Sequence, residues 1–142
     1  MNILIVSSPY YPEISDQLMR GTTATLAEAG ASYEAIEVPG AFEIPGAIRL
    51  ALGSKKFDGY IALGCVIRGE TTHYDYVCGE SARGLMDLSL EHNAAIGYGI
   101  LTVENKEQAH ARADVDKGNK GKDAAAACLR MIELKQQFGC NE

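Results

Sequence analysis

The chain has 142 residues, a formal net charge of −6 and an apolar content of 46%, and it contains no tryptophan. This composition is typical of globular proteins and excludes a disordered or fibrous chain; the length suits one domain, which we expect to span residues 1–142. The acidic balance and the lack of a Lys/Arg cluster argue against nucleic acids and anionic membranes as partners.

No targeting or membrane segment is predicted. The N-terminal stretch MNILIVSSPYY has no basic region and only four consecutive apolar residues after Asn2, which is too short for a signal peptide. Nor does any stretch approach the roughly 20 apolar residues of a membrane span. The cysteines at 65, 78, 128 and 140 form no CxxC motif and no zinc spacing with histidine. We therefore expect four free thiols in a cytoplasmic protein.

The first half of the chain predicts two strands and two helices. Residues 3–8 form a β-branched apolar run, typical of a strand buried on both faces. Helical spacing follows over 13–29, and residues 32–38 alternate like a second strand. A short helix is predicted over 42–52, with Pro45 in its first turn, where a missing N–H costs little.

The second half repeats the alternation. Residues 59–67 predict a third buried strand, 72–91 a helix, and 94–102 a fourth strand. Two further helices are expected over 104–113 and about 121–138. The fourth strand contains two glycines, which often allow a ligand or another backbone to come close.

Two helices have a predicted inner face. On the helix over 72–91 we place Leu85, Met86 and Leu88 near the core. The last helix carries an apolar stripe at helical spacing, formed by Ala125, Cys128, Leu129 and Ile132.

Alternating apolar strands and helices predict an α/β fold with a parallel sheet covered by helices on both faces. In such sheets, ligands bind beyond the carboxyl ends of the strands. The loops after Ser8, Val38 and Ile67 should therefore meet and form a site.

Several residues in these loops allow either a functional or an ordinary structural interpretation. Gly69, followed by Thr71 and Thr72, indicates either an anion site at a helix start or a simple N-cap. His73 is either a proton carrier or a surface histidine. Glu43 either accepts hydrogen bonds from ligand hydroxyls or complements the helix dipole.

Taken together, the motifs resemble the 6,7-dimethyl-8-ribityllumazine synthase family. The matching stretches are VPGAFEIPGA (38–47), ALGCVIRGETTHYDYVCGESARGL (62–85), GYGILTVENKEQAHARA (97–113) and GNKG (118–121). The resemblance implies a flavodoxin-like three-layer α/β/α sandwich with a four-stranded parallel sheet of order 2-1-3-4. It also implies condensation of 5-amino-6-(D-ribitylamino)uracil with 3,4-dihydroxy-2-butanone 4-phosphate, giving the lumazine, phosphate and water, with no metal or organic cofactor.

The same resemblance assigns roles position by position. His73 matches the proton-transfer histidine of the family. The phosphate site is matched by Gly69, Glu70, Thr71, Thr72 and Arg112. The ribitylaminouracil site is matched by Tyr10, Ala41, Phe42, Glu43, Val66, Ile67, Tyr98 and Lys120. Tyr10 stands where the family stacks an aromatic ring on the pyrimidine, with Tyr11 as the alternative. Asp114 and Asp116 make the neighbourhood of Arg112 more acidic than expected for a phosphate site.

The family further implies a homo-oligomer with a site shared between adjacent subunits, in which Tyr98, Arg112 and Lys120 come from the neighbour. We expect a pentamer or a pair of pentamers rather than a sixty-subunit shell, because only two residues precede the first predicted strand. A functional link to riboflavin synthase is a further expectation. The alternatives are an archaeal-type riboflavin synthase and a non-catalytic flavin- or lumazine-binding protein.

Overall fold

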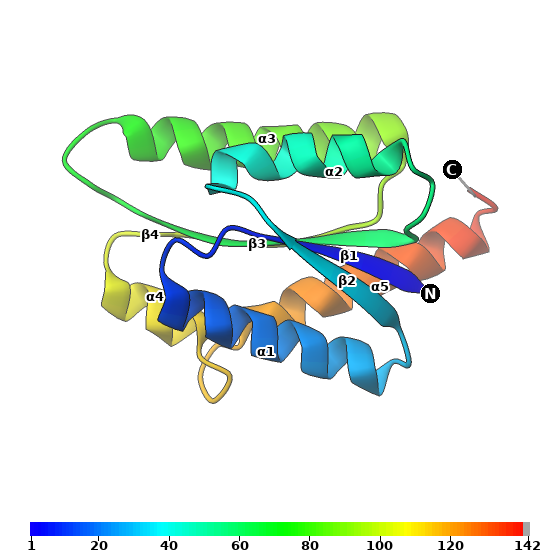
Figure 1. Ribbon diagram of the computed structural model, residues 1–142, viewed down its shortest axis with the longest axis horizontal. Helices are drawn as coiled ribbons and strands as arrows, with labels where there is room; N and C mark the ends of the chain where they lie inside the picture. Colours follow the sequence, from blue (N-terminus) through cyan, green and yellow to red (C-terminus); the bar gives the residue numbers. More distant parts are fainter. Residues whose placement is uncertain (141–142) are drawn as a thin grey trace.

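A computed structural model gives the structure of the chain and describes residues 1–140. Four strands form one parallel sheet in the order β2-β1-β3-β4 (Figure 1). The strands are β1 (Asn2–Ser7), β2 (Ser32–Glu37), β3 (Gly59–Ile67) and β4 (Ile96–Val103). The helices are α1 (Pro12–Glu28), α2 (Ile44–Leu52), α3 (His73–His92), α4 (Lys106–Ala113) and α5 (Lys120–Gln137), with a 3-10 turn at Ala41–Glu43.

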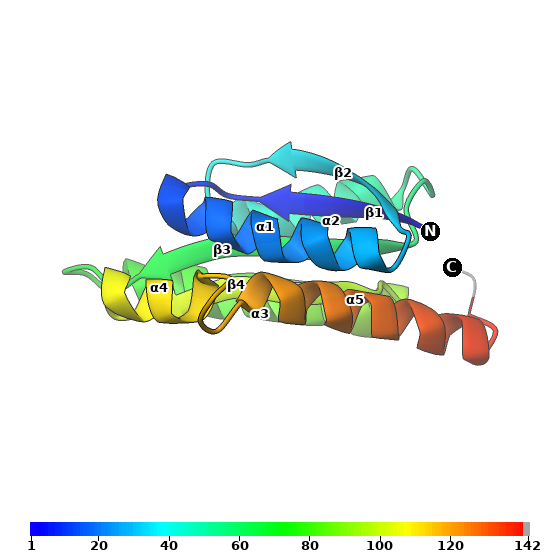
Figure 2. The same ribbon diagram turned by 90° about the horizontal axis from the view of Figure 1, so that it is seen from below.

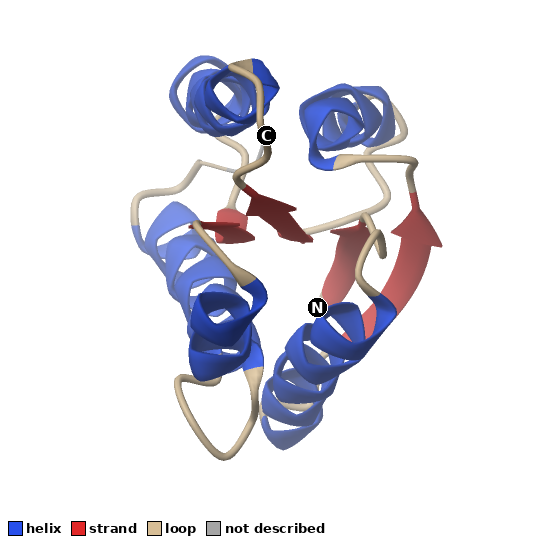
Figure 3. Cartoon of the chain, turned by 90° about the vertical axis from the view of Figure 1, so that its left-hand side faces the viewer, coloured by secondary structure: helices blue, strands red, loops and turns tan. Residues whose placement is uncertain are grey.

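The helices form two layers with the sheet between them. Helices α2 and α3 cover one face, and α1, α4 and α5 cover the other (Figures 1 to 3). The predicted fold class, strand order and three layers are confirmed. Among residues 1–140, no helix is both long and apolar enough to cross a membrane.

Some element boundaries differ from the predictions by a few residues, and the causes are local. The helix predicted over 42–52 divides into the 3-10 turn and α2, which has a proline in its first turn. Helix α4 begins at Lys106 rather than 104, because the Asn105 side chain accepts a hydrogen bond from the Gln108 N–H at 2.8 Å. This is an ordinary N-cap, which fixes where the helix can start.

Each face of the sheet carries its own apolar core because neighbouring residues of a strand point to opposite sides. Ile3 and Ile5 of β1 pack with the layer of α1, α4 and α5. Leu4 and Val6 of the same strand pack with the layer of α2 and α3. The apolar stripe of α5 also packs into the first of these cores, with Cys128 fully buried.

Two predictions about burial are wrong. Met86 is 57% exposed, whereas Leu85 and Leu88 are buried, since Met86 is rotated by about 100° from Leu85 around the helix. All six residues of β2 are exposed, whereas apolar strands covered by helices on both faces were expected. The strand lies at the sheet edge, so it has no neighbour on one side.

The glycines of β4 make room for a helix rather than for a ligand. A side chain at Gly97 would run into the backbone carbonyl of Ala124 in α5. Gly59 on the adjacent strand serves the same helix, because a Cβ there would lie 2.6 Å from the Cys128 sulfur. All four cysteines are free thiols, as predicted, and burial raises the pKa of Cys128 to about 12.

Candidate functional site

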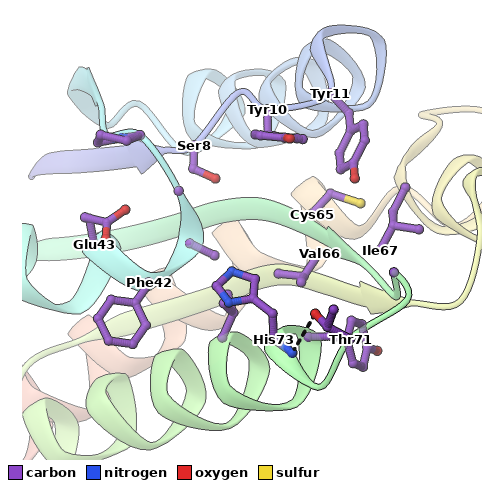
Figure 4. Close-up of a pocket in the computed structure, with 16 residues that line it drawn as sticks. Ser8, Tyr10, Tyr11, Phe42, Glu43, Cys65, Val66, Ile67, Thr71 and His73 are labelled. Atoms are coloured by element: carbon purple, nitrogen blue, oxygen red, sulfur yellow. Dashed lines mark hydrogen bonds between the residues drawn. The ribbon is translucent and has the colours of Figure 1, made fainter.

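A cavity of about 570 Å³ lies beyond the carboxyl ends of the strands (Figure 4). The loops that follow β1, β2 and β3 form its walls, together with the first turns of α3. The lining residues are Ser8, Tyr10, Tyr11, Pro39, Gly40, Ala41, Phe42, Glu43, Cys65, Val66, Ile67, Gly69, Thr71, His73, Tyr74 and Val77. The prediction that these three loops meet is thus confirmed.

The loop after β1 offers two aromatic rings. Tyr10 is 72% exposed, whereas Tyr11 is partly buried and packs against the core below it. Their ring centroids lie 5.0 Å apart in an edge-to-face arrangement. Burial, the Cys65 thiol and Tyr10 together raise the pKa of Tyr11. Tyr10 therefore has the freer ring face, although both rings border the cavity.

The loop after β2 brings a carboxylate to the opposite wall. Ala41 is buried and anchors the 3-10 turn, while Phe42 is 56% exposed at the cavity rim. In Figure 4 the Glu43 side chain lies on this wall. Its carboxylate forms no hydrogen bond or ion pair with any residue in the described part of the chain. Glu43 is consequently free to accept hydrogen bonds from a ligand.

The end of β3 and the turn after it form the third wall. The Cys65 thiol is held neutral, because burial and the nearby Cys78 raise its pKa to about 11. Beyond it, the backbone N–H groups of residues 69–72 donate no hydrogen bond to any residue from 1 to 140. Unpaired amides just ahead of a long helix, near its positive dipole end, are suited to an anion.

His73 begins α3 and projects into the cavity (Figure 4). Its backbone N–H donates to the Thr71 hydroxyl at 3.3 Å, which fixes the turn locally. Thr72 occupies the N-cap position, but its side chain makes no capping hydrogen bond. The N-cap interpretation therefore fails for Thr72, whereas the Thr71 hydroxyl does accept the N–H of the first residue of the helix. The amides of residues 69–72 stay unpaired among residues 1–140, so an anion remains a chemically reasonable occupant of the turn.

Arg68 braces this turn from outside the cavity. Its Nε donates to both carboxylate oxygens of Glu104, just after β4, at 2.8 and 3.1 Å. Its guanidinium also lies 3.5 Å from the Asp75 carboxylate and 4.3 Å from the centroid of the Tyr74 ring. The start of α3 is thus tied to the ends of two strands.

Five of the residues assigned by resemblance do not line the cavity of one chain. Glu70 and Thr72 belong to the turn but are absent from the cavity wall. Tyr98 is 43% exposed on β4, and burial, followed by Cys78, raises its pKa. Arg112 donates to the Gln108 carbonyl at 3.1 Å near the end of α4. Lys120 begins α5, with its Nζ 3.4 Å from the Asp123 carboxylate.

The acidic residues beside Arg112 are partly engaged elsewhere. The Asp114 carboxylate lies 3.0 Å from His110 Nδ1 and 3.8 Å from Lys117 Nζ. Its charge is therefore directed toward these two side chains.

Sequence reasoning missed several lining residues, among them Ser8, Cys65 and Tyr74. Ser8 stands directly after the first strand, and its position at the strand end was the available signal. Among residues 1–140, no group of three or more His, Cys, Asp or Glu side chains is placed to hold a metal ion.

Comparison with known proteins gives a consistent result. A family model described as 6,7-dimethyl-8-ribityllumazine synthase matches residues 1–136. A protein of that name from Bartonella henselae is 54% identical over 98% of this chain and 91% of its own length. One from Sphingopyxis alaskensis is 53% identical over 97% of both chains. A 6,7-dimethyl-8-ribityllumazine synthase 1 from Rhizobium meliloti is 51% identical over 100% of this chain and 96% of its own.

Proposed function

Because the chain belongs to the 6,7-dimethyl-8-ribityllumazine synthase family, we propose that it makes this lumazine in riboflavin biosynthesis. The substrates are 5-amino-6-(D-ribitylamino)uracil and 3,4-dihydroxy-2-butanone 4-phosphate, and phosphate and water are released. The observation that carries the proposal is the cavity itself, which joins an imidazole, an unpaired carboxylate and a turn with free amides.

Each wall of the cavity has a role in the proposed binding mode. Tyr10 stacks on the pyrimidine ring through its exposed face. Glu43 accepts hydrogen bonds from the ribityl hydroxyls, with Ala41 and Phe42 beside it. The backbone at Val66 and Ile67 meets the heterocycle.

The phosphate of the second substrate sits on the turn formed by Gly69, Glu70, Thr71 and Thr72. Their amides have no other acceptor among the described residues, so they stabilise the charge of the departing phosphate. Arg112 of an adjacent subunit adds a guanidinium, which suits bidentate phosphate binding.

His73 moves protons during the reaction. The primary amine attacks the ketone carbonyl, one water leaves as the imine forms, and phosphate is eliminated. The secondary amine that carries the ribityl chain then closes the ring on the remaining carbonyl carbon with loss of a second water. Each of these steps transfers a proton, and an imidazole can both accept and donate one. Holding both substrates in register contributes much of the remaining acceleration.

An absorbance assay tests the function. Wild-type protein with both substrates should produce the lumazine chromophore, and omission of either substrate should abolish it. Incubation with the lumazine alone separates the closest alternative, because an archaeal-type riboflavin synthase would form riboflavin from it. Binding of the lumazine without turnover in either assay would favour a non-catalytic binding protein.

We also propose a homo-oligomer, a pentamer or a pair of pentamers, with Tyr98, Arg112 and Lys120 reaching the neighbour's cavity. Support comes from where these residues lie in one chain, away from the cavity wall. Sedimentation measures the assembly, and a sixty-subunit shell would contradict the proposed size.

Mixing two defective variants tests the sharing of the site. Chains with His73→Ala and chains with Arg112→Ala are unfolded together, refolded, and assayed at low concentration of the phosphorylated substrate. If the two kinds of chain mix at random in a ring, about a quarter of the sites contain both a wild-type His73 and a wild-type Arg112. Activity should therefore exceed that of either variant alone, whereas a site built within one chain would recover nothing.

A further inference from the structure

Ser8 is a largely buried residue whose side chain borders the cavity and whose hydroxyl has no hydrogen-bond partner among residues 1–140. The residue is only 3% exposed, at the end of β1. Its backbone N–H donates to the Leu63 carbonyl at 3.0 Å, which fixes the residue against β3. Its Oγ makes no hydrogen bond to any residue between 1 and 140. A hydroxyl that borders the cavity and pairs with no described residue is available to hydrogen-bond a ligand there.

The surroundings of this hydroxyl are apolar and leave room for it. A Cβ at Gly64 would lie 3.2 Å from the Ser8 Oγ, 3.7 Å from Ile44 Cδ1 and 3.8 Å from Ala41 Cβ. Gly64 therefore provides the space that the hydroxyl occupies. In an apolar wall, one polar group of this kind fixes the orientation of a ligand.

The position within the cavity indicates which substrate meets Ser8. Figure 4 shows Ser8 on the wall that carries Tyr10, whereas Thr71 lies on the far side beside the start of α3. The free amides that suit a phosphate belong to residues 69–72 on that far side. Ser8 therefore lies on the wall where the heterocycle stacks in the binding mode proposed above.

We infer that the Ser8 hydroxyl is a substrate-binding group that hydrogen-bonds the polar edge of the pyrimidine ring of 5-amino-6-(D-ribitylamino)uracil. A hydroxyl both donates and accepts, so it can pair with a ring carbonyl or a ring N–H. The inference rests on the proposed function for the identity of the ligand, and on Ser8 itself for the contact.

Ser7 provides a matched control. It is the preceding residue of the same strand, 2% exposed, and its Oγ lies 3.4 Å from the Ser15 hydroxyl, with which it pairs. It does not line the cavity. Removing either hydroxyl deletes one oxygen from a buried serine, but only Ser8→Ala removes it from the cavity wall.

Steady-state kinetics with both substrates test the inference. Loss of one neutral hydrogen bond should raise the KM for 5-amino-6-(D-ribitylamino)uracil about threefold to tenfold in Ser8→Ala. The KM for the butanone phosphate should stay at its wild-type value, and Ser7→Ala should change neither KM. Equal values for the two variants, or a rise confined to the phosphorylated substrate, would overturn the inference.

A second variant and a binding measurement keep the two proposals separate. Gly64→Ala should raise the same KM, because the added methyl crowds the Ser8 hydroxyl. Titration calorimetry with 5-amino-6-(D-ribitylamino)uracil alone should show weaker binding for Ser8→Ala than for Ser7→Ala. If Ser8→Ala binds more weakly than Ser7→Ala but the wild-type protein forms no lumazine, the Ser8 contact is supported and the proposed function is refuted. Equal binding by the two variants would refute the contact.

Discussion

Replacing Gly97 with alanine tests why glycine stands in the middle of β4. The position is buried, and an added methyl would run into the backbone carbonyl of Ala124 in α5. A carbonyl in the middle of a helix cannot rotate away as a side chain can, so strand and helix must separate. Because α5 packs along β4 and into the larger core, the separation disturbs more than one contact.

The expected loss follows from two opposing contributions. Overpacking a core typically costs about 1–3 kcal/mol, and a backbone obstacle places Gly97→Ala near the upper end. Alanine also restricts the unfolded chain, which returns about 0.4–1 kcal/mol. The free energy of unfolding should therefore fall by about 2 kcal/mol.

Gly79→Ala is the matched control. Gly79 lies inside α3, and nothing in the described chain is within 4 Å of a methyl added there. Alanine in a helix interior should stabilise the protein by about 0.5–1 kcal/mol. Urea unfolding followed by circular dichroism, at one protomer concentration for all variants, measures both changes. Equal midpoints for the two variants would refute this account of β4.

Three further predictions concern the site and its thiol. His73→Ala should lower kcat by about 10²–10⁴-fold with unchanged urea unfolding; full activity would remove its proposed role. Arg112→Ala should raise the KM for the phosphorylated substrate by about tenfold or more, with the other KM unchanged. Burial raises the pKa of Cys65 from 9.0 to about 11, so the folded chain holds this proton more tightly than the unfolded chain. The associated stability is complete below pH 9 and is lost as the pH rises toward 11, so Cys65→Ala should flatten the fall in unfolding free energy between about pH 9 and 11.

The fold could be predicted from the sequence because short apolar runs typical of strands alternate regularly with segments of helical spacing. The apolar runs at 3–8 and 59–67 are too short for helices and are bounded by turns, so they had one interpretation. Met86 shows the limit of this reasoning, since an apolar residue adjacent to the inner face still points outward. The exposure of β2 could not be predicted from the sequence either, because the position of a strand at the sheet edge depends on strand order and not on the local residue pattern.

The candidate site was predicted in part, for a similar reason. Strand ends are visible in the sequence, so the loops that carry Tyr10, Glu43 and His73 could be brought to one edge. Which side chains in those loops stay unpaired depends on contacts from other helices and strands. Ser8 and Ser7 are neighbours of the same type, and only the packing of Ser15 and Gly64 distinguishes their hydroxyls.

The position of Arg112 near the end of α4, away from the cavity lining, supports the proposal that it serves the cavity of a neighbouring chain. Helix α4 starts near the cavity, where Lys106 Nζ lies 5.8 Å from the centroid of the Tyr11 ring. Arg112 follows six residues later in the same helix, about 9 Å further along its axis. Its guanidinium turns back only as far as the Gln108 carbonyl. The Arg112 guanidinium thus hydrogen-bonds within its own helix, and this placement is in keeping with the proposal above that a second chain supplies the arginine at the turn.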